Sequence, residues 1–343
     1  MKEIKVAWIT DRGLPSKWYQ RYFFPLSDSG IMRYKNIARE MKSLSPLIRN
    51  ELYRQGKRYD VLVVLKRISD DICRVVRDEK QKGTKIIFDA NVNYYKVWGD
   101  FPVPHTRPTL EQQQNAVWLT QNSDNVVADS SYIASICREY NPNVFHIPDN
   151  VDPLAFNGLR KHRQADIATL VWSGISQKAF HLSLIEETLK ELKDKIRLLL
   201  VSNNDRFPEV VTRLGAMFEV VYHKFSLKKY AALLLQGDIL ISPKVLNNSY
   251  EMGHSEYKIT LGMAQGLPVL ASPQQSYVEA LQNSGAGIIC KDSNEWRNGF
   301  LALINNAGMR QNMGVNGKEI VRARYSSKVV AGQYAELISQ MVQ

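Results

Sequence analysis

Short apolar stretches alternate with amphipathic ones along most of the chain, and this alternation limits the fold more than any other feature of the sequence. Apolar runs of about five residues are typical of buried strands, and apolar residues at helical spacing are typical of helices. In the first half, the predicted strands are residues 6–10, 60–65, 85–89, 125–129 and 144–148. The predicted helices between them are residues 30–41, 68–81, 110–121 and 131–140. This order predicts a parallel, doubly wound sheet.

Residues 149–167 interrupt the alternation with Asp, Asn, Pro, Gly and basic residues, as a linker would. The pattern then restarts with predicted strands at residues 168–172, 196–202, 220–225, 238–243, 268–272 and 287–290. The predicted helices are residues 181–192, 227–235, 255–266, 276–283, 295–306, 309–325 and 327–343. The sequence therefore predicts an α/β chain with two doubly wound, Rossmann-like domains that face each other across a cleft. We expect an N-terminal domain at 1–150, a linker at 151–167, a C-terminal domain at 168–325 and a last helix at 326–343.

One strand–helix–strand unit in the second half predicts a ligand site. A helix capped by Ser255 and ended near Gly266 lies between the strands at 238–243 and 268–272. The loop at 244–254 follows the carboxyl end of the first of these strands, where open α/β sheets bind ligands. Lys258 falls in the first helical turn, where the helix dipole disfavours a cation. An anion bound at the same helix end would account for the lysine.

Composition excludes several classes of protein. The chain has 343 residues, of which 44% are hydrophobic and 23% charged, which indicates a soluble globular protein of about two domains. No apolar run approaches the roughly 18 residues that cross a membrane, and the N-terminus does not resemble a signal peptide. Cys73, Cys137 and Cys290 lie far apart without metal-site spacing, so we expect buried, reduced thiols.

The formal net charge of +11 is spread over both halves of the chain. No basic tail and no nucleic-acid motif accompanies it. A solvated basic surface is the simpler interpretation, and a patch for an anionic lipid or a polyanionic substrate is the alternative. The aromatic residues at 18–24 would pack on their own domain, bind an acceptor or touch a membrane surface.

Several blocks together resemble the GT-B glycosyltransferases, in particular the family-4 retaining transferases of bacteria. Residues 258–269 are similar to that family's Lys-hydrophobic-hydrophobic-Glu-Ala-Met-Ala-x-Gly-x-Pro-Val block. Residues 128–131 and 147–152 resemble the segment that leads into the family's linker, and residues 295–326 resemble its closing helices. The resemblance spans nearly the whole chain and rests on the order and spacing of these blocks.

The resemblance implies transfer of a sugar from a nucleotide-sugar donor to a glycan or lipid-linked acceptor, with retention of the anomeric configuration. The donor would bind the C-terminal domain and the acceptor mostly the N-terminal one, and the last helix would cross back to the N-terminal domain. No metal or other cofactor is expected. The protein would act in the cytoplasm, or on the inner face of the membrane, in the assembly of a bacterial surface polysaccharide.

Donor-binding candidates come from two segments of the second half. Lys258 and Lys178 would hold the diphosphate, because the departing group gains negative charge in the transition state. Lys178 belongs to the turn that begins at Gly174, after the first strand of the C-terminal domain. The other candidates precede Lys258, and they are His254, Ser255 and Glu256. For each of them an ordinary surface or capping role is the alternative.

Candidates on the acceptor side come from the first half. Asp89 ends a predicted strand at the ligand-bearing edge, where it would bind the acceptor or act as a base. Gly30 would allow close approach of a phosphate at a helix start. Arg33, one turn further, would face either the diphosphate or the solvent. His105 is a loop histidine and a weaker candidate for a functional role than His254.

The sequence also departs from the family pattern. The family has two glutamates eight positions apart, and the second bonds the ribose hydroxyls of the donor. Here these positions hold Gly253 and Leu261. The arginine of the phosphate turn is replaced by Ile175 or Ser176, and only Gly30 represents the glycine pair of the first domain. A non-catalytic GT-B partner protein, a DNA glycosyltransferase and a nucleotide-sugar epimerase therefore remain as alternative functions.

Overall fold

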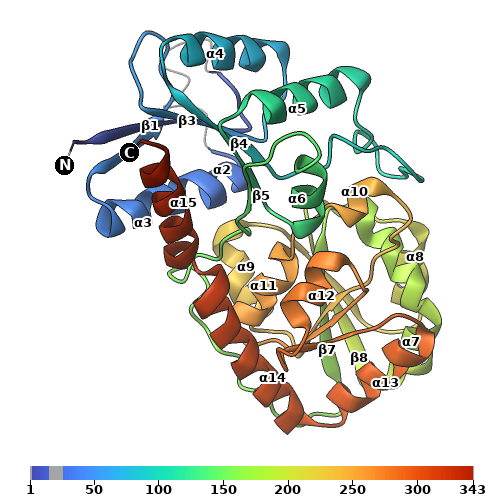
Figure 1. Ribbon diagram of the computed structural model, residues 1–343. Helices are drawn as coiled ribbons and strands as arrows, with labels where there is room; N and C mark the ends of the chain where they lie inside the picture. The colour runs from blue at the N-terminus through green and yellow to red at the C-terminus, as the bar shows by residue number, and fades with distance from the viewer. Residues whose placement is uncertain (1, 15–25, 343) are drawn as a thin grey trace. The chain divides into compact units, whose positions relative to one another are not determined.

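The computed structural model describes residues 2–14 and 26–342, and its chain divides into two compact units (Figure 1). The first unit comprises Met1–Asp152, Asn248–Ser255 and Tyr325–Gln343, and the second comprises Pro153–Asn247 and Glu256–Arg324. Each unit contains one six-stranded sheet. Residues 248–255, expected within the C-terminal domain, cluster with the first unit instead. The aromatic stretch at 18–24 lies outside the described residues.

The first unit is built on a parallel sheet in the order β2-β1-β3-β4-β5-β6. Its strands are β1 (Ile4–Ile9), β2 (Ile48–Leu52), β3 (Val61–Leu65), β4 (Lys85–Ala90), β5 (Asn125–Ala128) and β6 (Val144–His146). All five residues of β3 are apolar and buried. A strand with both faces covered reads as a continuous apolar run rather than an alternating one. The parallel, doubly wound sheet predicted from the alternation of strands and helices is therefore confirmed.

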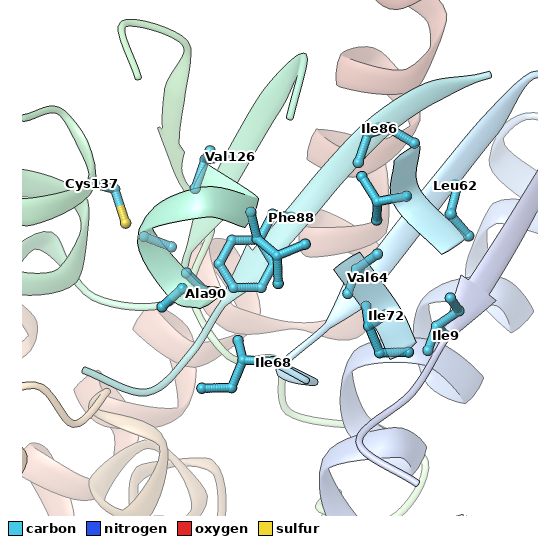
Figure 2. Packing of buried hydrophobic residues seen from close by; sticks show 14 of the residues in the cluster. Ile9, Leu62, Val64, Ile68, Ile72, Ile86, Phe88, Ala90, Val126 and Cys137 are labelled. Atoms are coloured by element: carbon cyan, nitrogen blue, oxygen red, sulfur yellow. The ribbon is translucent and has the colours of Figure 1, made fainter. Parts of the chain in front are cut away.

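Helices cover both faces of this first sheet. The helices of the first unit are α2 (Asp28–Gly30), the π-helical turn η1 (Ile31–Asn36), α3 (Ile37–Leu44), α4 (Asp70–Gln81), α5 (Leu110–Asn122), α6 (Ser131–Cys137), α10 (Ser249–Met252) and α15 (Ser327–Met341). Leu62 and Val64 join the core on one face, with Ile72 of α4 (Figure 2). Val61 and Val63 join the core on the other face, which α3 and α15 cover.

The second unit contains a parallel sheet in the order β12-β11-β10-β7-β8-β9. Its strands are β7 (Ala168–Gly174), β8 (Ile196–Ser202), β9 (Val220–Lys224), β10 (Ile239–Ser242), β11 (Val269–Ala271) and β12 (Gly287–Ile289). Its α-helices are α7 (Glu186–Glu191), α8 (Glu209–Gly215), α9 (Leu227–Leu234), α11 (Tyr257–Ala264), α12 (Gln275–Leu281), α13 (Ser293–Ile304) and α14 (Ala307–Ile320). Tighter or wider turns are η2 (Ser176–Ile185), η3 (Lys193–Lys195) and η4 (Val321–Tyr325).

Five elements differ from the sequence predictions. The edge strand β2 was not predicted, because Arg49, Asn50 and Glu51 make it polar. The short helices α8 and α10 were not predicted either. The first helix begins before Gly30, after the capping residue Ser27. The helix expected at 181–192 begins in the 3₁₀ segment η2, which ends at Ile185, and continues as the α-helix α7.

The described residues include no helix that is both long and apolar enough to cross a membrane. Cys73, Cys137 and Cys290 are all buried and free, as predicted.

Candidate functional site

The order of strands in the second sheet locates the edge at which a ligand would bind. The chain runs outwards from β7 through β8 to β9, and then starts again on the other side of β7 with β10. In open α/β sheets the ligand crevice lies outside the carboxyl ends of the strands at such a reversal. Gly174 is the last residue of β7, and Lys244 follows β10 by two positions. Both residues therefore lie at the edge where a ligand is expected.

Lys258 lies beside the end of β7. Its Nζ is 5.4 Å from the centroid of the buried Trp172 ring. A Cβ built at Gly174 would lie 3.4 Å from the same Nζ and 3.0 Å from the Trp172 ring. A side chain at Gly174 would therefore crowd the Trp172 ring, on which the ammonium group lies, and would touch the ammonium itself. The structure brings together Gly174 and Lys258, which belong to separate motifs of the sequence.

The Trp172 ring also changes the argument from the helix dipole. A cation in the first turn of a helix costs about 0.3–1 kcal/mol. A cation over an aromatic face gains roughly 0.5–2 kcal/mol, depending on how far it is removed from water. The contact with Trp172 alone can offset the cost at Lys258, so the position of the lysine does not by itself require an anion. What points to an anion is that this ammonium lies at the strand-order reversal.

Lys244 is a second cation at this edge, and it was not among the predicted site residues. It is 6% exposed, its ammonium bonds to Gln274 Oε1, and it lies 4.9 Å from the centroid of the Tyr277 ring. Its backbone N–H donates to Ser272 Oγ at 2.8 Å. Burying an ammonium group is costly, so its environment must compensate. The available signal was a lysine directly after the predicted strand at 238–243.

Two further residues, both in η2, follow β7. Lys178 lies half-buried in the first turn of η2, and its backbone N–H donates to the carbonyl of Ile175. His181, further along η2, is buried and accepts the Val245 N–H on Nδ1 at 3.0 Å. Because Nδ1 accepts, a neutral His181 carries its proton on Nε2. The turn after β7 thus contributes the predicted Lys178 and an unpredicted histidine.

The start of α11 differs from the sequence prediction. Glu256, not Ser255, is the capping residue, and its carbonyl accepts the N–H groups of Ile259 and Thr260. The Ser255 hydroxyl instead donates to Asp149 Oδ2 at 2.6 Å, within the first unit. Leu261, at the position of the expected ribose-binding glutamate, is 5% exposed. Glu256 is a buried carboxylate one turn earlier in the chain.

In the first unit, Arg33 and Asp89 belong to one buried cluster. Arg33 Nε donates to Asp89 Oδ2 at 3.0 Å, and Nη1 donates to Asp149 Oδ1 at 2.7 Å. Arg33 Nη2 donates to the Tyr334 hydroxyl at 2.9 Å, and that hydroxyl donates to Asp89 Oδ2. The cluster joins η1, the end of β4, the segment after β6 and helix α15. Arg33 is therefore buried and does not face solvent.

In this cluster one guanidinium, that of Arg33, pairs with two carboxyl groups, those of Asp89 and Asp149. Burial opposes the charge of Arg33, but Asp89 and its neighbours raise the arginine pKa well above the ordinary value. Burial raises the pKa of Asp89, against the effect of Arg33. A single guanidinium leaves one of two negative charges uncompensated, which agrees with this direction.

Asp89 has no exposed surface, so this geometry favours a positioning role over contact with an acceptor. Its Oδ1 has no hydrogen-bond partner among the described residues. The roles predicted for Asp89 and Arg33 in binding or catalysis stay predictions.

The remaining candidates occupy ordinary positions. Gly30 has a helical φ of −66°, and its N–H donates to the capping Ser27 Oγ at 3.0 Å. A Cβ at Gly30 would lie 3.3 Å from a methyl group of Leu26, so only a slight shift would be needed. His254 packs edge-on against Tyr250 with ring centroids 4.5 Å apart. The weaker candidate His105 has a positive φ of 62°.

Comparisons with known proteins agree with this architecture. No protein-family model matches the chain. An uncharacterized glycosyltransferase of Methanocaldococcus jannaschii is 25% identical over 158 residues, which cover 45% of this chain and 39% of that relative. The match therefore spans about two fifths of the relative's length.

Crystal structures of similar proteins cover the whole fold. A glycosyltransferase from Rickettsia africae aligns with a TM-score of 0.69 and 15% identity, over 100% of this chain and 99% of its own. Anabaena HepE, in complex with UDP and glucose, aligns with a TM-score of 0.67 and 12% identity over 98% and 100%. Sucrose-phosphate synthase from Thermosynechococcus elongatus aligns with a TM-score of 0.66 and 12% identity over 99% of each chain. The chain has the GT-B fold, which confirms the predicted resemblance to GT-B glycosyltransferases and the predicted fold class.

Proposed function

We propose that the protein transfers a sugar from a nucleoside-diphosphate sugar to a hydroxyl group of a glycan or glycoconjugate, with retention of the anomeric configuration. The observation that carries the proposal is the Lys258 ammonium at the strand-order reversal of the second sheet, beside Gly174. Lys244 adds a buried cation after the neighbouring strand β10.

The chemistry of a diphosphate leaving group fits these side chains. As the bond between the sugar and the diphosphate breaks, negative charge grows on the diphosphate oxygens. Fixed cations stabilise this charge without reorganising, and they act most strongly where water is excluded. We assign this role to Lys258, with Lys244 and Lys178 in support. The acceptor hydroxyl would attack from the face that the diphosphate leaves, and no protein nucleophile or metal is part of the proposal.

UDP-glucose is the first donor to test, because Anabaena HepE has been crystallised with it. We expect Lys258→Ala to weaken UDP-glucose binding at least about tenfold, the loss of one charge-assisted hydrogen bond. The measurement is titration calorimetry on the full chain. Lys190→Ala is the matched control, because Lys190 lies on the surface helix α7 and is 59% exposed. If the chain binds UDP-glucose and Lys258→Ala binds it as tightly, Lys258 does not hold the diphosphate.

A second candidate function follows from Leu261. A buried leucine where a carboxylate is expected favours a GT-B protein that binds partners without catalysing transfer. Thermal unfolding with a panel of nucleotide sugars separates the two candidates. A donor at 100 times its Kd stabilises the fold by about 2.7 kcal/mol. Stabilisation followed by release of the nucleoside diphosphate supports the transferase, and no stabilisation by any donor supports the binding protein.

A further inference from the structure

The second unit has a cationic cavity at the amino ends of its strands, whereas the donor candidates Gly174 and Lys244 lie at the carboxyl ends. Its volume is about 360 Å³, and Arg160, Lys161, Arg163, Arg197 and Asp238 supply its charged lining. Thr169 and Arg197, the second residues of β7 and β8, also line it, and Asp238 immediately precedes β10. These are the amino ends of parallel strands.

The charges of this cavity are not balanced. Among the described residues, four cationic side chains and a single carboxylate, that of Asp238, line it. Asp238 Oδ1 accepts from Arg160 at 3.0 Å, and Oδ2 accepts the Thr169 N–H at 2.9 Å. Within residues 2–14 and 26–342, no side-chain hydrogen bond or ion pair is found for Lys161 or Arg163. Their charges are therefore available to a ligand.

Arg197 is oriented for such a ligand. Its Nε donates to Thr169 Oγ1 at 2.7 Å, which fixes the plane of the guanidinium. In the described part of the chain, its two terminal nitrogens have no partner. A planar guanidinium with both terminal nitrogens available binds phosphate through two parallel hydrogen bonds. A side chain that is already held in place loses less freedom on binding.

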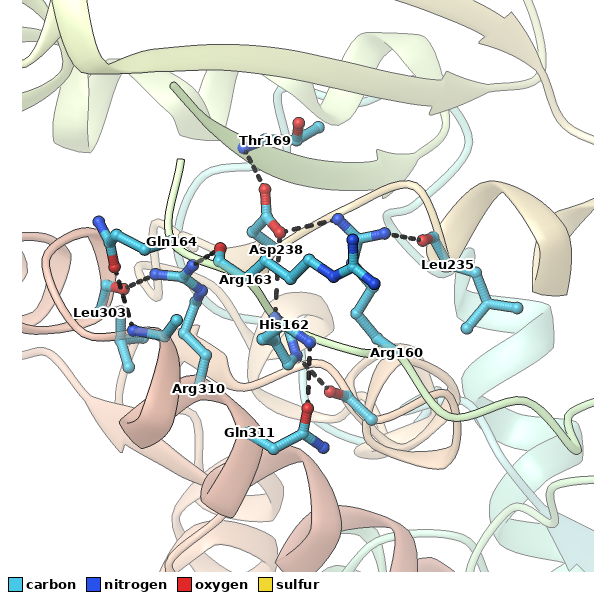
Figure 3. A network of polar contacts seen from close by, with 12 residues as sticks. Arg160, His162, Arg163, Gln164, Thr169, Leu235, Asp238, Leu303, Arg310 and Gln311 are labelled. Carbon is cyan, nitrogen blue, oxygen red and sulfur yellow. Dashed lines mark hydrogen bonds and ion pairs between the residues drawn. The ribbon is translucent and has the colours of Figure 1, made fainter. Parts of the chain in front are cut away.

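The backbone segment that carries Lys161 and Arg163 is fixed by hydrogen bonds to the rest of the second unit (Figure 3). The His162 N–H donates to Gln311 Oε1 at 3.0 Å, and its Nε2 contacts the Gly266 carbonyl at 2.9 Å. The Arg163 carbonyl accepts from Arg310 at 2.8 Å. These contacts hold the segment through its backbone and through the His162 ring. They do not involve the side chains of Lys161 and Arg163.

Capping of helix ends explains only some of the arginines at this edge. Arg160 donates to the carbonyl of Leu235 after α9, and Arg310 donates to the carbonyls of Leu303 and Ile304 in α13. Cations stabilise the carboxyl ends of helices in this way. Capping does not account for Lys161, Arg163 or Arg197.

A second cationic cavity, in the first unit, provides a contrast. It has about 680 Å³ and is lined by Lys2, Lys5, Arg58, Lys82 and Lys85, with Glu3 and Asp60. Three of its five cations are already paired with carboxylates: Lys2 with Asp60 at 3.5 Å, Lys82 with Glu79 at 2.8 Å and Lys85 with Asp124 at 3.5 Å. Of the four cations that line the second unit's cavity, Arg160 alone is so paired within the described residues. The second unit's cavity therefore has the larger unpaired charge.

We propose that the cavity lined by Arg160, Lys161, Arg163 and Arg197 is an anion site that binds a phosphate or diphosphate group. The group would lie on the Arg197 fork, with Lys161 and Arg163 beside it. Ile167 also lines the cavity and is 50% exposed, which adds an apolar rim next to the charges. A soluble phosphate compound and a phosphate-bearing lipid headgroup share this chemistry. The site is separate from the donor candidates and does not depend on the proposed function.

The test uses the full chain with Lys258→Ala, so that binding at the donor candidates is weakened. Inorganic pyrophosphate is titrated by calorimetry at low ionic strength, because salt screens exposed charges. We expect Arg197→Ala to weaken pyrophosphate binding at least about tenfold. The Lys161→Ala/Arg163→Ala double variant should also bind pyrophosphate at least about tenfold more weakly. It should still fold, because both substitutions leave the backbone hydrogen bonds of this segment intact. Lys82→Ala, from the contrasting cavity, is the control and should bind as before.

A second arm distinguishes the two sources of phosphate. Sedimentation is measured with vesicles of phosphatidylcholine, with and without phosphatidylglycerol. Binding to the anionic vesicles that is lost in both cavity variants supports the site and assigns a lipid phosphate. Loss of pyrophosphate binding alone supports the site and assigns a soluble phosphate compound. The proposal is overturned if the two cavity variants bind both probes as the Lys258→Ala parent does, or if the parent binds neither probe. UDP-glucose affinity should be unchanged by Arg197→Ala in the otherwise native chain.

Discussion

Arg33 and Arg39 lie six positions apart in one helical segment, and both pair with carboxylates. The Arg33 side chain has no exposed surface and contacts Asp89 and Asp149. The Arg39 side chain is 39% exposed and contacts Glu40 and Asp152. Removing one partner from a buried pair leaves an uncompensated buried charge, whereas water replaces the partner of an exposed pair.

We therefore expect very different losses of stability from the two arginines. Arg33→Ala should lower the free energy of unfolding by about 3–5 kcal/mol. Arg39→Ala should lower it by less than about 1 kcal/mol. Urea denaturation followed by circular dichroism provides both values. Equal losses would show that the Arg33 cluster is not the buried ion pair described here.

His162 makes the stability of the second unit depend on pH. Burial lowers the pKa of His162, and the nearby Arg310 and Arg160 act in the same direction, against the Gly266 carbonyl and Asp238. The unfolded chain then binds a proton near the ordinary value of about 6.5, where the folded chain does not. The contribution of His162 is fully present above about pH 6.5 and is lost as the pH falls towards the folded pKa.

The measurement is thermal unfolding between pH 7.5 and 5.5. The native chain should lose stability as the pH falls, and His162→Gln should reduce that slope. An unchanged slope in His162→Gln would assign the pH dependence to other groups.

At the scale of the elements, α14 and the turn after α11 approach each other closely through two glycines. Gly314 lies in α14, and a Cβ there would be 2.1 Å from the Gly266 carbonyl oxygen. Gly266 itself has a positive φ of 79°, a conformation that L-residues with a side chain rarely adopt. The backbone of Gly266 therefore cannot yield easily.

We expect Gly314→Ala to lower the melting temperature strongly, because the helix would have to move away from a fixed backbone atom. Gly215, the last residue of α8, is the control, because a Cβ there meets nothing within 4 Å. Gly215→Ala should be neutral, or more stable by up to about 1 kcal/mol. A melting temperature unchanged by Gly314→Ala would contradict the close approach.

The elements also show what the sequence can predict. Buried parallel strands such as β3 are continuous apolar runs, so they were predicted almost to the residue. The edge strand β2 is polar and pairs only with β1, so no local pattern distinguished it from a loop. The site residues likewise fall into those that a local motif predicts and those that only the folded chain brings together. Gly174 and Lys258 belong to recognisable motifs, whereas the contacts of Arg33 with Asp149 and Tyr334 span 116 and 301 positions.

At the scale of the whole molecule, the first unit is discontinuous in sequence. Residues 1–152 provide its sheet, but α15 covers one face with Val330, Tyr334 and Ile338. A fragment of residues 1–152 would expose that apolar face and leave Arg33 and Asp89 without Tyr334. We expect the fragment to aggregate or to unfold without cooperativity. Thermal unfolding by circular dichroism tests this, and a sharp transition at the temperature of the full chain would contradict it.

The Tyr334 contacts also have a consequence for the order of events during synthesis. Domains generally begin to fold as they leave the ribosome, with the N-terminal part first. Here the sheet of the first unit emerges early, but the helix that closes it is translated after the whole of the second unit. At about 5–20 residues per second, the roughly 180 residues between positions 152 and 334 take on the order of 10–40 seconds. During that interval the nascent first unit has an open apolar face, so this protein would depend on chaperones more than a chain whose domains are each contiguous.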